Sequence, residues 1–244
     1  MANIKPKKNA LILALLFVFS KGASQGFQNF PDLGADLDSW HASAADNINA
    51  PIMNGVHYYK REDQMITPDQ NPFFEESWDH EGSLTYEGRQ YPKSTITYNI
   101  SEDILLIWSP EMNKGGQKSL MIDQSKIDSF QVHKQLFLNY KHAGIGNRGF
   151  YKKVMQGKHL TCMSKISKTG SLEDVDYIYE EKRQYWVRYK AKNHNYKRVS
   201  SLYQIFPSLK KQIKRYHNEI RFILREDKER YIQLMLYYCD SIVK

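Results

Sequence analysis

Hydrophobic and polar positions change their spacing along the chain, from alternation in the middle to a helical repeat near the C-terminus. Between residue 55 and residue 200, short apolar and aromatic runs are separated by turn residues, with a period of about 8–14 residues. Little sequence of helical spacing lies between these runs, which favours antiparallel meanders over βαβ units. Gly88 fits the positive-φ position of a hairpin turn between two of the runs. The expected strands cover 83–86, 89–91, 95–98, 104–108, 119–122, 129–132, 135–138, 149–155, 158–163, 177–179, 184–189 and 196–199.

The C-terminal part has helical periodicity. One apolar stripe runs along a first helix after Pro207, and a second follows Asp227, which is a candidate N-cap. The first stripe consists of Leu209, Ile213, Tyr216, Ile220 and Leu224, and the second of Tyr231, Leu234, Tyr238 and Ile242. Two amphipathic helices joined by a short link predict a helical hairpin. The fold class that we expect is α+β, with an antiparallel, sandwich- or barrel-like body and a C-terminal helical hairpin.

The N-terminus has the pattern of a secretion signal. Lys5, Lys7 and Lys8 precede an unbroken apolar run from Ala10 to Phe19, and small and polar residues follow. A run of this length is too short to span a bilayer, and no later stretch is longer. We therefore expect a signal peptide over 1–25, a polar arm over 26–54, a β-rich domain over 55–200, and the helical hairpin over 201–244 on the same domain. The mature chain is expected to have no transmembrane segment.

Composition adds two features, an aromatic content of 13% and an uneven charge. The net charge is +8, and residues 25–140 hold 8 Lys and Arg against 17 Asp and Glu, a balance of −9. Residues 141–244 hold 23 against 10, a balance of +13. Three interpretations are open: the two halves attract each other, the charges are spread over solvated faces, or a basic face meets an anionic polymer or lipid headgroup. Lys210, Lys211, Lys214 and Arg215, which lie on the polar side of the first helix, are the candidate binding residues of such a face.

Aromatic and basic residues interleave in the segment from Tyr177 to Tyr196. Tyr185, Trp186 and Arg188 are its candidate binding residues. Such a segment can build a stacking platform for sugar rings or for a partner's Pro-rich segment, or it can form a core with amphipathic tyrosines at the rim.

Motifs that carry catalytic or cofactor chemistry are weak. Residues 144–149 match G-x-G-x-x-G, but a strand follows where a dinucleotide site needs a helix, so we interpret them as a loop between strands. His80 lies between Asp79 and Glu81, where it is a general base, a metal ligand or part of a solvated acidic loop. Cys162 and Cys239 form either one disulfide or two separately buried thiols. We expect no catalytic residue, metal site or cofactor.

Several runs resemble a family of exported, uncharacterised proteins from Bacteroidetes-type Gram-negative bacteria. The similarity spans about residues 55–242. The runs that carry it are Asn71–Phe74, Trp78, Gly82–Pro92, Tyr98–Ile100, Asp103–Leu105, Gly149–Tyr151, Gly157–Lys158 and Phe206–Pro207. The resemblance implies export to the periplasm or beyond and a β-rich body with a helical tail, and it supplies no catalytic residues.

These observations predict a non-enzymatic, exported cell-envelope protein, periplasmic or associated with the outer membrane. Its partner is expected to be an envelope protein or an anionic glycan or lipid headgroup, and not nucleic acid. The alternative is a periplasmic hydrolase with a carboxylate and histidine site between Glu75 and Glu81.

Overall fold

The computed structural model describes residues 52, 54–59, 71–75, 80–108, 119–173 and 176–243, and for residues 172–177 it describes no side chains. The expected signal peptide, almost all of the polar arm, and Trp78 and Asp79 lie outside the described residues. The strands are β1 (Val56–Tyr58), β2 (His80–Tyr86), β3 (Arg89–Asn99), β4 (Ile104–Trp108), β5 (Ser119–Met121), β6 (Ile127–Val132), β7 (Gln135–Asn139), β8 (Phe150–Gln156), β9 (Leu160–Glu173), β10 (Asp176–Tyr189) and β11 (Lys192–Tyr196). The helices are η6 (Gln124–Lys126), α3 (Tyr140–Ala143), α4 (Val199–Ile205), η7 (Pro207–Leu209), α5 (Lys210–Ile220), α6 (Ile223–Glu226) and α7 (Lys228–Ile242).

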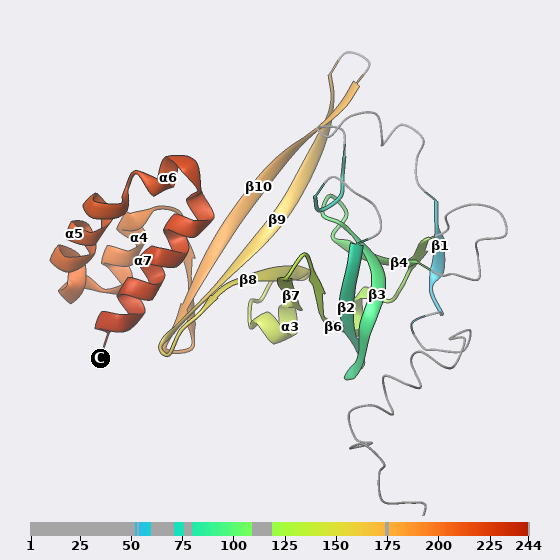
Figure 1. Cartoon of the computed structure of the whole chain (residues 1–244), viewed down its shortest axis with the longest axis horizontal. Coiled ribbons are helices and arrows are strands. Elements are labelled where there is room, and N and C mark those ends of the chain that lie inside the picture. Colours follow the sequence, from blue (N-terminus) through green and yellow to red (C-terminus); the bar gives the residue numbers. More distant parts are fainter. Residues whose placement is uncertain are drawn as a thin grey trace, which may run out of the picture. The chain divides into compact units, whose positions relative to one another are not determined.

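The described strands form one antiparallel sheet of eleven strands, in the order β1-β5-β4-β3-β2-β6-β7-β8-β9-β10-β11. The turn between β2 and β3 has Gly88 at φ 76°, as the sequence predicts. β9 and β10 pair over 14 residues each and form the long ribbon in Figure 1. The expected α+β class and antiparallel pairing are confirmed. The strand order shows an open sheet and does not show the expected sandwich or barrel.

The part of the sheet between β3 and β8 is strongly curled. These two strands lie four places apart in the strand order, about 19 Å in a flat sheet. The rings of Tyr98 in β3 and Phe150 in β8 nevertheless lie 5.9 Å apart. Lys165 of β9 also reaches Asp103, in the β3–β4 turn, with its Nζ 2.5 Å from Oδ2. The curl encloses one aromatic core, to which Phe74, Tyr98, Phe130, Phe137 and Phe150 belong.

A second core joins the C-terminal helices to one face of β8–β11. It contains Leu160, Cys162 and Val187 from the strands and fully buried residues of α4, α5 and α7. Two polar contacts of α7 reinforce it. Lys152 of β8 donates to Glu229 at 2.5 Å, and Asp240 accepts from three backbone N–H groups of the β8–β9 turn. The C-terminal helices α4, α5, α6 and α7 lie together in Figure 1.

Several details differ from the sequence predictions. The segments 177–179 and 184–189 belong to one strand, β10. The predicted strand at 158–163 continues to Glu173 in β9, and this extension was not predicted. Leu224 is 41% exposed, because α6 is a separate four-residue turn and the spacing of α5 does not carry over to it. Ile213 is fully buried, and Asp227 caps α7 through the N–H of Arg230, as predicted.

The buried face of α7 is rotated from the predicted stripe, because α5 and the strands β8 and β9 cover it from two sides. Its buried residues are Tyr231, Ile232, Met235, Leu236 and Cys239.

Candidate functional site

The face of β7–β11 that is turned away from the C-terminal helices α4–α7 carries a cavity of about 460 Å³. Alternation along each strand separates the two faces, so Trp186 and Arg188 border the cavity while Tyr185 and Val187 pack beneath the helices. The cavity is lined by Leu138, His142, Ala143, Ile145, Lys153, Gln156, Thr161, Met163, Trp186, Arg188 and Asn193.

The floor of the cavity consists of two rows of cross-strand neighbours. In the first row, Met163 of β9 pairs with Lys153 on one side and with Trp186 on the other. In the second row, Thr161 pairs with Gln156 and Arg188, and Arg188 pairs with Asn193 of β11. Successive rows lie about 7 Å apart along a strand, and strands lie about 5 Å apart. Lys153 and Arg188 therefore approach the floor from opposite corners.

The wall of the cavity comes from α3 and the loop that follows it. Ala143 and Ile145 are buried in a small cluster with Tyr151, Met163 and the partly buried Trp186. The side-chain amide of Asn193 donates to the carbonyl of Gly144 at 2.6 Å, which ties the wall to the edge strand β11. Floor and wall are thus joined by both apolar packing and a direct hydrogen bond.

Gly144 leaves the space in which Arg188 lies. It is the C-cap of α3, with φ 67°, and a Cβ on it would overlap the guanidinium of Arg188. It also begins the G-x-G-x-x-G match. The structure places this match between α3 and β8, so it is a loop that a strand follows, as predicted. Gly144 therefore shapes the cavity.

The ring of Trp186 is held in place from one side. Tyr151 meets it edge to face, with ring centroids 5.4 Å apart and an interplanar angle of 78°. The hydroxyl of Tyr151 donates in turn to the carbonyl of Asn147, at 3.1 Å. The indole is partly buried, so one part of it packs and the other faces the cavity.

Two side chains of the cavity, Lys153 and Arg188, carry positive charge. In the part of the chain that the structure describes, neither Lys153 nor Arg188 forms an ion pair with a carboxylate. His142 at the rim pairs with Asp128, Nε2 to Oδ1 at 3.0 Å. The cavity combines two cations, an aromatic face, and amide and hydroxyl groups of Gln156, Thr161 and Asn193.

Tyr185, which the sequence predicts as a binding residue, does not border this cavity. It is 3% exposed and lies in the core beneath the helices. Burial raises its pKa to about 12, and Glu229 adds to the rise. A strand's alternation places Tyr185 and Trp186 on opposite faces, so only one of them can border the cavity.

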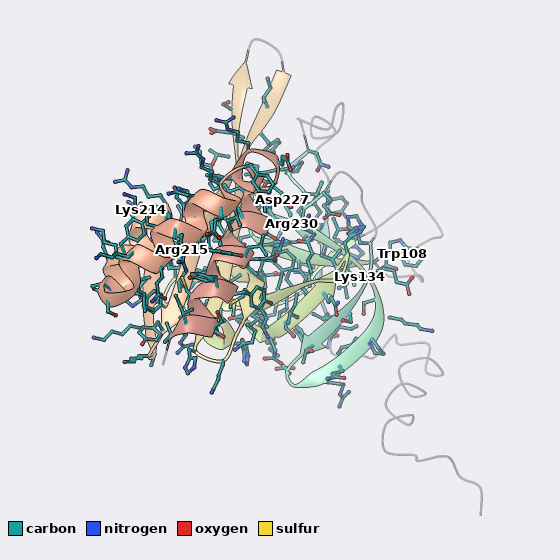
Figure 2. All side chains as sticks on the ribbon, turned by 60° about the vertical axis from the view of Figure 1, so that its left-hand side comes forward. Trp108, Lys134, Lys214, Arg215, Asp227 and Arg230 are labelled. Atoms are coloured by element: carbon teal, nitrogen blue, oxygen red, sulfur yellow. The ribbon has the colours of Figure 1, made fainter. Side chains whose placement is uncertain are left out.

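The predicted basic residues of α5 form a separate surface. Lys210, Lys211, Lys214 and Arg215 are all exposed, on helices that cover the other face of the sheet. Arg215 has one weak partner on its own helix, Glu219, at 3.9 Å. Figure 2 shows Lys214 and Arg215 on α5, where nitrogen-tipped side chains extend from the ribbon. The structure does not bring this group together with Trp186 and Arg188.

The histidine predicted for a hydrolase site is buried. His80 is 6% exposed, and its Nδ1 contacts Nε2 of His133, which pairs with Glu75 at 3.3 Å. Glu81, next to it in the chain, is exposed. Within the described ranges, no group of three or more His, Cys, Asp or Glu side chains is arranged to hold a metal ion.

The two cysteines are separate buried thiols, which is one of the two predicted alternatives. Cys162 and Cys239 both belong to the core between the sheet and the helices. Burial raises the pKa of each to about 12, so neither supplies a thiolate at neutral pH.

The sequence pattern predicts Trp186 and Arg188 as binding residues, and it does not predict Lys153, Thr161 and Asn193, which also line the cavity. The predicted hairpin of 149–155 with 158–163 contained a signal for Lys153, because alternation along a strand places Lys153 on the same face as Tyr151. What was missing was the register with β10, which brings Lys153 and Trp186 onto the same row.

Comparisons with protein-family models, with curated proteins and with solved structures gave no match. Among the described residues, none of the helices has the length and apolar character needed to cross a membrane.

Proposed function

We propose that the protein is a non-enzymatic binding protein that takes an acidic saccharide in the cavity of β7–β11. The observation that carries the proposal is the placement of Trp186 on one cavity floor with two cations, Lys153 and Arg188, for which the described residues supply no carboxylate partner. A sugar ring presents C–H groups that pack on an indole face, and its carboxylate or sulfate pairs with ammonium and guanidinium groups.

The dimensions of the cavity support a ligand of one or two sugar rings. A volume of about 460 Å³ lies within the usual range for small-ligand sites. Gln156, Thr161 and Asn193 supply the amide and hydroxyl groups that ring hydroxyls require. The anionic glycan expected from the sequence is thus assigned to the cavity, rather than to the basic surface of α5.

Retention on immobilised oligosaccharides tests the proposal. We expect the wild type to be retained by oligogalacturonate and not by a neutral maltooligosaccharide of the same length. Trp186→Ala and the double change Lys153→Gln with Arg188→Gln should each abolish retention. Lys192→Gln, which removes an exposed charge from β11, is the matched control and should be retained like the wild type. Equal retention of all four proteins would refute the assignment.

We further propose that the protein is exported to the periplasm or the outer membrane, as the apolar run of residues 10–19 and the family resemblance favour. We also propose a barrel-like form for the curled part of the sheet. The contact of Lys165 with Asp103, between β9 and the β3–β4 turn, supports it.

A further inference from the structure

The outer side of α5 continues into an exposed aromatic residue. Ile213 is buried, and Lys211 and Arg215 lie about 160–200° around the helix from it. Arg221 and Phe222, which follow α5, keep αR backbone angles, so the helical spacing extends to Phe222. Phe222 therefore falls on the same outward side as Lys211 and Arg215, and its side chain is 61% exposed.

This outward side is strongly cationic. Residues 210–225 hold six Lys and Arg against one acidic residue, Glu219. Glu219 lies 3.9 Å from Arg215, with both side chains largely exposed, so it screens that charge weakly. Within the described residues, no carboxylate pairs with Lys211, Lys214 or Arg221. The acidic N-terminal half is one explanation that the sequence left open for these charges, and none of its described carboxylates pairs with them.

The positive charge alone would attract any polyanion, but the exposed apolar residues restrict which class of anionic partner fits this surface. Phe222 and Leu224, which is 41% exposed, alternate with Arg221, Ile223 and Arg225. A soluble polyanion offers nothing apolar to cover these side chains. An anionic bilayer offers both phosphate groups for the cations and an interface into which an aromatic ring can insert.

We propose that the outward side of α5 and the turn at Arg221–Leu224 dock on the surface of an anionic lipid bilayer. Lys211, Lys214, Arg215 and Arg221 contact the headgroups, and Phe222 enters the interface. This surface is separate from the cavity of β7–β11, so the proposal does not depend on the saccharide proposal. In an exported protein, the surface would hold the molecule against a membrane while the cavity stays open to its ligand.

Sedimentation with vesicles tests the proposal on the full chain. The probes are vesicles of phosphatidylcholine alone and of phosphatidylcholine with 30% phosphatidylglycerol. Each basic residue near an anionic surface changes the partition coefficient by a factor of about five. The triple change Lys211→Gln, Lys214→Gln and Arg215→Gln should therefore weaken binding to the anionic vesicles about a hundredfold. Phe222→Ser should weaken it about tenfold.

The control replaces three exposed cations elsewhere, with Arg89, Lys93 and Lys192 each changed to Gln. This variant should bind within about threefold of the wild type. All variants carry the same apolar run at residues 10–19. Its contribution to vesicle binding therefore cancels when the affinity of a variant is divided by that of the wild type. If the control variant binds the anionic vesicles as weakly as the triple variant, the attraction depends on net charge alone and the proposal is wrong.

An unchanged affinity of Phe222→Ser for anionic vesicles, with loss in the triple variant, would show that the surface recognises polyanions by charge. In that case competition by soluble heparin should be complete, and the lipid assignment would be wrong.

Discussion

Tyr185 and Trp186 are neighbours in β10 and face opposite sides of the sheet. Tyr185 is 3% exposed in the core beneath the helices, whereas Trp186 borders the cavity on the other face. The sheet of β8–β11 therefore has two distinct roles. One face holds the C-terminal helices, and the other carries the cavity.

Ile213 should anchor α5 to the sheet. It is fully buried, and its truncation removes several methyl and methylene groups from the core of Leu202, Met235 and Cys239. We predict that Ile213→Ala lowers the free energy of unfolding by about 2–5 kcal/mol. Lys214→Ala, one residue further and exposed, should change it by less than about 0.5 kcal/mol. Urea denaturation measures both, and equal effects would contradict the assigned face.

Gly144 should be required for both stability and the cavity. An alanine there would have to adopt φ 67° and would meet the guanidinium of Arg188. We expect Gly144→Ala to cost about 1–2 kcal/mol in thermal or urea unfolding and to weaken saccharide binding. Gly146→Ala is the matched control, because nothing lies within 4 Å of its added methyl group. If Gly144→Ala binds the saccharide as tightly as the wild type, binding does not depend on the space that Gly144 leaves for Arg188.

Asp240 should make stability depend on pH in the acid range. It accepts from the N–H groups of Lys158, His159 and Leu160 at 2.7–2.9 Å. Burial acts to raise its pKa, but these three bonds together hold the pKa below the ordinary 3.8. Its stabilisation is therefore complete above about pH 4 and is lost as the pH falls through the lowered folded-state pKa.

We predict that Asp240→Asn costs about 1–3 kcal/mol at pH 7. The difference from the wild type should shrink as the pH falls below 4. Glu226→Gln, which changes an exposed carboxylate, should show no such trend. A difference that stays constant from pH 7 to pH 2.5 would mean that the charge of Asp240 is not what the β8–β9 turn requires.

Export with cleavage remains a prediction from the sequence. N-terminal sequencing of the protein recovered from the cell envelope should begin between Ala23 and Phe27. An intact Met1 in that fraction would contradict cleavage.

The sequence pattern predicted local elements well and the long-range arrangement poorly. Gly88 and the alternation around it gave the β2–β3 hairpin, and Asp227 marked the start of α7, because both signals lie within a few residues. The curl that brings Lys165 to Asp103 has no local signal, since it depends on the accumulated twist of several strands.

For the candidate site too, the sequence predicts the local features and not the long-range contacts. Alternation alone separates Tyr185 from Trp186, and the aromatic and basic composition of β10 drew attention to Trp186 and Arg188. The contribution of Lys153 depends on the register of β9 with both of its neighbours, which places Lys153 and Trp186 on either side of Met163. The role of Gly144 depends on a contact with Arg188, 44 positions further along the chain, and spacing within one motif does not contain that information.

The indole N–H resonance of Trp186 during a titration with digalacturonic acid tests the central claim most directly. The chain has four tryptophans, and Trp186→Phe assigns the signal of Trp186 by its loss. We predict a saturable shift of this resonance that Lys153→Gln weakens and Lys192→Gln leaves unchanged. Saturable binding that leaves the Trp186 resonance in place would put the ligand elsewhere and contradict the account.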